Sequence, residues 1–131
     1  MRLLAVFSNP ALEQRALEYA VSGKVRNQDA IIQLLISLEV PETRDMAWQF
    51  IQQNWDKVMA QSTTSMGGYL VSGGGAFCTA EKRDEVVQFF TEHKVPASEH
   101  ALGRARDQIN DCIQLRSDQE SKLQQWISTQ K

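Results

Sequence analysis

Apolar residues recur at intervals of three and four along most of this chain, and this periodicity limits its fold more than any other feature. In residues 42–61, Trp48, Ile51, Trp55 and Val58 follow one another at intervals of three, four and three. Such spacing places them on one side of an α-helix, with glutamines and an aspartate elsewhere on its surface. Alternating strand-like runs are nearly absent. The pattern predicts an all-α chain with Trp48 and Trp55 in the core.

Capping residues and prolines divide the first half into helices. Asn9 before Pro10 predicts a helix over residues 10–21 that stops at Ser22 and Gly23. A shorter helix should precede it. Asn27 and Asp29 can accept hydrogen bonds from the first N–H groups of the next helix, which should end at a proline. The apolar stripe of this helix consists of Ile31, Leu34, Leu35 and Leu38, and Pro41 ends the helix.

The second half shows three further helix starts. Thr79 should cap one helix and Ser98 should begin another, while the run from Ser117 to Glu120 is a capping box for a last helix. The helix that begins at Thr79 should have its apolar face at Val86, Val87, Phe89, Phe90 and His93. The helix that begins at Ser98 should have its apolar face at Leu102, Ala105, Ile109 and Cys112, and the last helix at Leu123, Trp126 and Ile127. About eight helical segments result.

A glycine-rich stretch interrupts the pattern between residues 62 and 76. Five glycines fall within the nine residues of GGYLVSGGG. Each glycine costs a regular helix roughly 1 kcal/mol relative to alanine. We therefore expect a loop here, with no more than a short helical turn.

The connections between the expected helices are short, which favours antiparallel neighbours. Helical hairpins stacked into a solenoid and a compact bundle both satisfy this constraint. No clean sequence repeat distinguishes them. The length of 131 residues suits one domain, so we expect a single helical domain over residues 1–131.

The composition excludes several classes of partner. The formal charge is −2 and the basic residues form no block, which disfavours binding to nucleic acid. Apolar runs such as Ala30 to Leu38 are far shorter than the roughly 20 residues that a bilayer requires, so we expect no membrane span. The compartment stays open.

The chain carries little that could perform catalysis. Its two histidines, His93 and His100, do not form the H-E-x-x-H pattern of a zinc site. Cys78 and Cys112 lack framework spacing and cationic neighbours, so we expect two free, unreactive thiols. The run of residues 72–75 lacks the Gly-Lys ending of a phosphate-binding loop. We expect no catalytic residue, metal site or cofactor in this chain.

Three segments carry a family resemblance. Residues 3–29 end in a Val-Arg-x-Gln-Asp element, residues 47–58 read AWQFIQQNWDKV, and residues 86–93 read VVQFFTEH. Together they resemble the C-terminal helical domain of the M1 family of zinc aminopeptidases, the group that contains the puromycin-sensitive and endoplasmic reticulum enzymes. The resemblance implies HEAT-like antiparallel hairpins stacked in a superhelix. It also implies that the chain is a fragment of a larger aminopeptidase, whose zinc lies in a separate catalytic domain.

In that family the helical domain closes a substrate chamber and helps to position peptides, so the implied partners are the catalytic domain and peptide substrates. Guanidinium groups suit peptide carboxylates. The candidate contacts are Arg26, Arg44, Tyr69, Arg104 and Arg106. Ordinary solvated surface charges are the other interpretation of the arginines. A stand-alone α-solenoid scaffold that binds other proteins is the alternative function.

The first residues suggest an exposed edge. Leu3, Leu4 and Phe7 have helical spacing, and the end of a solenoid normally needs a polar cap. An uncovered apolar stripe promotes self-association. We therefore expect the isolated chain to dimerise through this end, without physiological meaning.

Overall fold

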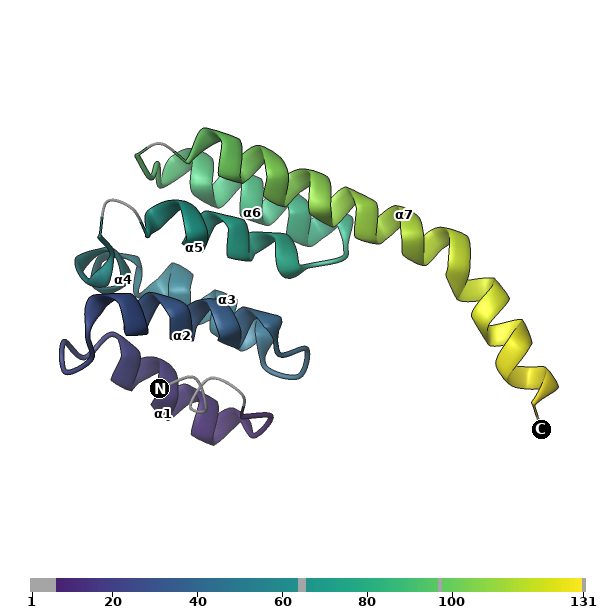
Figure 1. The fold of residues 1–131 in the computed structure, drawn as a ribbon, viewed down its shortest axis with the longest axis horizontal. Helices are drawn as coiled ribbons and strands as arrows, with labels where there is room; N and C mark the ends of the chain where they lie inside the picture. Colours follow the sequence, from purple (N-terminus) through teal and green to yellow (C-terminus); the bar gives the residue numbers. More distant parts are fainter. Residues whose placement is uncertain (1–6, 64–65, 97, 131) are drawn as a thin grey trace.

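The computed structural model describes residues 7–63, 66–96 and 98–130, and these residues form helices without a strand. The elements are α1 (Pro10–Ala20), α2 (Asn27–Glu39), α3 (Arg44–Gln53), α4 (Trp55–Gln61), α5 (Gly67–Gly73), the 3-10 helix η2 (Gly74–Ala76), α6 (Ala80–Glu92) and α7 (Glu99–Thr129). The predicted all-α class is confirmed. In Figure 1, α1, α2, α5 and α7 follow one another from bottom to top in one layer, and α3 and α6 lie behind them.

The start of α1 agrees with the prediction from the sequence. The Asn9 side chain accepts hydrogen bonds from the backbone N–H groups of Ala11 (3.0 Å) and Leu12 (3.2 Å), and Pro10 occupies the first turn. These bonds satisfy donors that have no partner within the helix. The helix ends after Ala20, and Gly23 follows in the left-handed conformation with φ of 77°. The shorter helix expected before α1 falls mainly on residues outside those described, and Phe7 itself is not helical.

The start of α2 differs from the prediction. Neither Asn27 nor Asp29 caps the helix, since Arg26 occupies the N-cap position and no side chain bonds to the first turn. The Asp29 carboxylate instead accepts a hydrogen bond from Arg26 Nε at 2.9 Å. The other end is closed by Arg44, whose guanidinium donates to the carbonyl oxygens of Leu38 (2.6 Å) and Glu39 (3.2 Å). A cation at the C-terminus of a helix also complements its dipole.

The single helix expected over residues 42–61 is divided in two at Asn54. The Asn54 amide donates to the Phe50 carbonyl at 3.1 Å, and its backbone N–H donates to the same oxygen at 3.0 Å. An asparagine side chain that competes for backbone groups in this way commonly ends a helix. The prediction of one continuous helix was therefore wrong.

The tryptophan of α3 lies at the centre of the core. Trp48 is fully buried, and its ring packs edge-on against Phe77 and Phe89 at centroid distances of 6.0 and 5.3 Å. Its indole N–H donates to Glu85 at 2.9 Å, so the buried polar atom is satisfied. Trp55 is only half-buried and packs against Phe89 at 5.2 Å. The predicted apolar stripe is confirmed, with Trp55 at its edge.

The glycine-rich stretch is helical, which contradicts the expected loop. Residues 67–76 form α5 and η2, and the three consecutive glycines each face a different helix. A Cβ on Gly73 would lie 2.7 Å from Leu35 of α2, one on Gly74 would lie 2.8 Å from Val86 of α6, and one on Gly75 would lie 2.7 Å from Gln108 of α7. The glycines therefore serve close packing between helices. The cost of placing glycine in a helix is offset by contacts that a side chain would prevent.

The C-terminal helix is longer than the sequence suggested. It runs unbroken for 31 residues through Ser117, so the predicted capping box caps nothing. No glycine or proline follows Gly103, and side-chain pairs four residues apart support the continuous helix. One such pair joins Arg116 to Glu120 at 3.7 Å, and another joins the Gln114 amide to Asp118 at 3.0 Å.

The two cysteines form a disulfide, so the expectation of free thiols was wrong. Cys78 lies in the connection between η2 and α6, and Cys112 lies on α7, with Cα atoms 5.3 Å apart. The two residues are 34 positions apart in the sequence. They meet because η2 packs directly on α7.

We predict that the effect of a glycine-to-alanine substitution on stability depends on the space around the glycine. Gly74→Ala should lower the free energy of unfolding by about 1–3 kcal/mol, because the new methyl group would overlap the β-branched side chain of Val86. The control is Gly103→Ala on α7, where a Cβ meets nothing within 4 Å. That change should raise the same quantity by roughly 0.5–1 kcal/mol. Urea unfolding of both variants measures the difference, and equal effects would contradict close packing at Gly74.

We also predict that the disulfide stabilises the fold. Replacing Cys78 and Cys112 by serine, or adding a reductant, should lower the free energy of unfolding by about 2–4 kcal/mol, because the link closes a loop of moderate length in the unfolded chain. Denaturant unfolding with and without reductant measures this effect. The double serine variant should be insensitive to reductant. If a reductant lowered the free energy of unfolding of that variant by the same amount, the loss of stability would have a cause other than the disulfide.

Candidate functional site

A groove lies where α2, α5, η2 and α7 meet, and we call it the α2–α5–α7 groove. It encloses about 520 Å³. Its lining residues are Leu35, Glu39, Arg44, Tyr69, Ser72, Gly73, Ala76 and Gln108. Two of the five residues predicted as contacts, Arg44 and Tyr69, are thus brought together from different parts of the chain. Gln108 was not predicted, because nothing local in α7 distinguishes it from the other exposed polar residues there.

The groove offers a mixed surface to a ligand. Tyr69 is 62% exposed at its rim, so its ring and hydroxyl are accessible. Leu35, Gly73 and Ala76 contribute small and apolar surface, and Glu39, Ser72 and Gln108 contribute polar groups. The Arg44 guanidinium already binds the last carbonyl groups of α2, which limits its capacity for a carboxylate. Such a surface suits the side chains and backbone of a peptide better than a compact anion.

The other three predicted contacts do not belong to this groove. Arg26 is almost fully exposed and pairs with Asp29 beside the start of α2. Arg106 pairs with the adjacent Asp107 at 3.1 Å, and both side chains are more than half exposed. Arg104 is exposed on α7. These positions are typical of solvated helix surfaces, where ion pairs contribute little.

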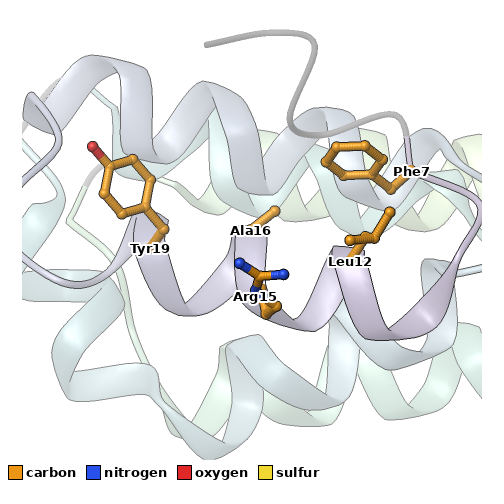
Figure 2. Close-up of a pocket in the computed structure, with 5 residues that line it drawn as sticks. All are labelled: Phe7, Leu12, Arg15, Ala16 and Tyr19. Atoms are coloured by element: carbon orange, nitrogen blue, oxygen red, sulfur yellow. The ribbon is translucent and has the colours of Figure 1, made fainter.

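A second concavity follows the outer side of α1. It encloses about 360 Å³ and is lined by Phe7, Leu12, Arg15, Ala16 and Tyr19. Figure 2 shows Phe7 beside Leu12, with Tyr19 further along the same helix. Leu12 and Tyr19 are 40% and 43% exposed. Leu12, Ala16 and Tyr19 follow one another at intervals of four and three, and this helical spacing is the signal in the sequence that could have located the concavity.

Comparison with known proteins decides the family. A family described as the ERAP1-like C-terminal domain matches residues 1–111. The chain belongs to this family. The ERAP1-like chain is 26% identical over 117 residues to "Aminopeptidase 2, mitochondrial" of Saccharomyces cerevisiae. The matched region covers 87% of this chain and 12% of the relative. It is 35% identical over 97 residues to "Aminopeptidase M1-B" of rice, covering 72% of this chain and 11% of the relative.

"Aminopeptidase M1" of Arabidopsis thaliana is 29% identical over 112 residues, which cover 82% of this chain and 12% of that protein. The ERAP1-like chain therefore spans roughly an eighth of the length of these relatives. The M1 resemblance inferred from residues 3–29, 47–58 and 86–93 is confirmed at the level of the family.

Within the described part of this ERAP1-like domain, no three His, Cys, Asp or Glu residues gather where they could hold a metal ion. His93 ends α6, where its ring stacks on Phe89 at a centroid distance of 4.3 Å and its Nδ1 lies 3.0 Å from the Phe89 carbonyl oxygen. His100 is exposed on α7. No helix among the described residues is long and apolar enough to cross a membrane.

Among the residues that the structure describes, Glu13 on the buried side of α1 carries an unusual carboxyl group. Glu13 is fully buried, and neither of its carboxyl oxygens has a hydrogen-bond partner among the described residues. Burial raises the pKa of Glu13, and the nearby Ser37 hydroxyl opposes that rise. Gln33 lies in the same α1–α2 interface and donates to the Ala16 carbonyl at 2.7 Å. Glu13 and Gln33 thus place two buried polar side chains in the α1–α2 interface.

We predict that Glu13 makes stability depend on pH. Because folding raises the pKa of Glu13, its contribution to the free energy of unfolding is fully present below the pKa of the unfolded state. That contribution is lost as the pH rises through the pKa of the folded state. Glutamine does not ionise, so the Glu13→Gln variant escapes this loss. The free energy of unfolding of the variant, relative to that of the wild type, should therefore increase from acidic pH towards neutrality. Urea unfolding at several pH values measures the difference. Glu18→Gln, an exposed change on the same helix, is the control. A wild-type-minus-variant difference that is constant with pH would contradict the prediction.

Proposed function

We propose that this chain is the non-catalytic C-terminal helical domain of an M1 aminopeptidase, and that it closes the substrate chamber and positions peptides. The family match over residues 1–111 supports this proposal most directly. The relatives are aminopeptidases about eight times longer, so the remainder of such a protein has room for a catalytic domain. The layered antiparallel helices are consistent with a HEAT-like superhelix that contributes one wall of a chamber.

In this proposal the chemistry belongs to zinc held by the parent catalytic domain, and the present chain acts by exclusion and positioning. Closing a site around the substrate excludes water, and contacts far from the reacting bond hold the substrate in a productive geometry. The α2–α5–α7 groove contains the contacts that we assign to the distal part of a peptide. Tyr69 is accessible there, and Gln108 contributes an amide from the facing helix.

We predict that groove substitutions in the parent enzyme will act on long substrates only. Tyr69→Ala combined with Gln108→Ala should lower kcat/KM for long peptides by about tenfold, since the contacts of the distal segment are lost. Turnover of a single-residue chromogenic substrate should not change, because that substrate does not reach the groove. Steady-state kinetics on both substrate classes measure the effect.

Arg106→Ala is the matched control, because Arg106 is exposed on α7 outside the groove and should affect neither substrate. Equal losses on long and short substrates would contradict a positioning role for the groove. The alternative, a stand-alone scaffold, makes a separate prediction about the gene. An upstream reading frame without an H-E-x-x-H motif would contradict the domain assignment itself and favour the scaffold.

A further inference from the structure

The polar groups that the α2–α5–α7 groove offers to a ligand are mainly hydrogen-bond acceptors. Glu39 lines the groove and is exposed, and no partner of its carboxylate is found among the described residues. The Ser72 hydroxyl donates its proton to the Gly68 carbonyl oxygen at 3.0 Å, so its own oxygen can still accept. Gln108 adds a side-chain amide whose oxygen can also accept. A ligand group that donates several hydrogen bonds suits this set.

The positive charge in the groove is already engaged. Of the described residues that line the groove, only Arg44 is a cation. Its guanidinium donates to the last carbonyl oxygens of α2, those of Leu38 at 2.6 Å and Glu39 at 3.2 Å. These carbonyl groups form the negative end of the helix dipole, so they offset part of the Arg44 charge. No described cation forms an ion pair with the Glu39 carboxylate, which therefore carries a charge available to a ligand.

An aromatic ring lines the groove together with this carboxylate. Tyr69 on α5 is 62% exposed, and Glu39 is the last residue of α2. The face of an aromatic ring carries negative charge and attracts cations. A carboxylate also forms its strongest hydrogen bonds with charged donors. Both groups thus favour a cationic ligand over a neutral or anionic one.

We propose that the α2–α5–α7 groove binds a lysine or arginine side chain in the distal part of a peptide. The proposal rests on the proposed function and adds to it the class of peptide that the groove prefers. An ammonium group offers three hydrogen-bond donors and a guanidinium group five, and neither accepts, which matches the acceptors of the groove. An acidic side chain would instead face Glu39 and find Arg44 engaged with α2.

Fluorescence anisotropy on the full chain tests the proposal with labelled peptides of equal length. The peptides are identical except at one position, which holds Lys, Gln or Glu. The Lys peptide should bind more tightly than the Gln peptide, and the Glu peptide should bind most weakly. Glu39→Gln should weaken binding of the Lys peptide by roughly two- to fivefold, as expected for an exposed ion pair, and leave the Gln peptide unchanged. Glu39→Arg should reverse the order of the Lys and Glu peptides.

Glu81→Gln is the matched control. It changes the net charge of the chain by the same amount at an exposed position on α6, outside the groove, so it should leave the three affinities unchanged. Thermal unfolding checks that each variant keeps the fold. An equal loss of Lys binding in Glu81→Gln and Glu39→Gln would overturn the proposal, because the net charge of the chain would then explain the preference. Equal affinities for the peptides, or no measurable binding of any of them, would also overturn it.

These outcomes are distinct from those that test the proposed function. The positioning role is measured by the kinetics of long and short substrates in the parent enzyme. If the groove positions peptides without a preference for charge, the Tyr69 and Gln108 substitutions would still affect long substrates, whereas Glu39→Gln would not change the affinity for the Lys peptide. That result would overturn the basic ligand and leave the positioning role intact.

Discussion

The close approach of helices at Gly73, Gly74 and Gly75 is the constraint on which the rest of the structure depends. The three residues face α2, α6 and α7 in turn, so one short segment is in contact with three helices. A Cβ at any of these positions would lie 2.7–2.8 Å from a side chain on a neighbouring helix, so that side chain or its helix would have to shift. The helix propensity of glycine is poor, but packing density in the interior is worth more than the local preference.

The same small residues shape the candidate site. Gly73 and Ala76 line the α2–α5–α7 groove together with residues of α2 and α7. Arg44 shows why a plausible binding residue is not always free to bind. It satisfies the last carbonyl groups of α2, and losing it would leave them without a protein partner. Tyr69 has no such structural task, and it remains the stronger candidate for contact with a peptide.

The disulfide marks the point where α7 leaves the body. Cys112 is among the last α7 residues that are not fully exposed, and beyond residue 113 every described position is exposed. The covalent link to Cys78 fixes the helix at this boundary. Residues 114–130 then continue α7 away from the stacked helices (Figure 1).

The features that could be predicted from the sequence alone are those set by interactions between residues close together in the chain. Periodicity established the all-α class and placed Trp48 in the core, the Asn9 and Pro10 pair defined the start of α1, and the segments 3–29 and 47–58 resembled the right family. Long-range contacts decided the rest. Whether glycines at 73–75 form a loop or a helix depends on the neighbours that they approach, and the pairing of Cys78 with Cys112 depends on η2 reaching α7 across 34 positions. Arg44 and Tyr69 were named from the sequence, but their meeting with Gln108 in one groove was not. Capping and periodicity act within a few residues, whereas close packing joins residues whose proximity only the tertiary structure defines.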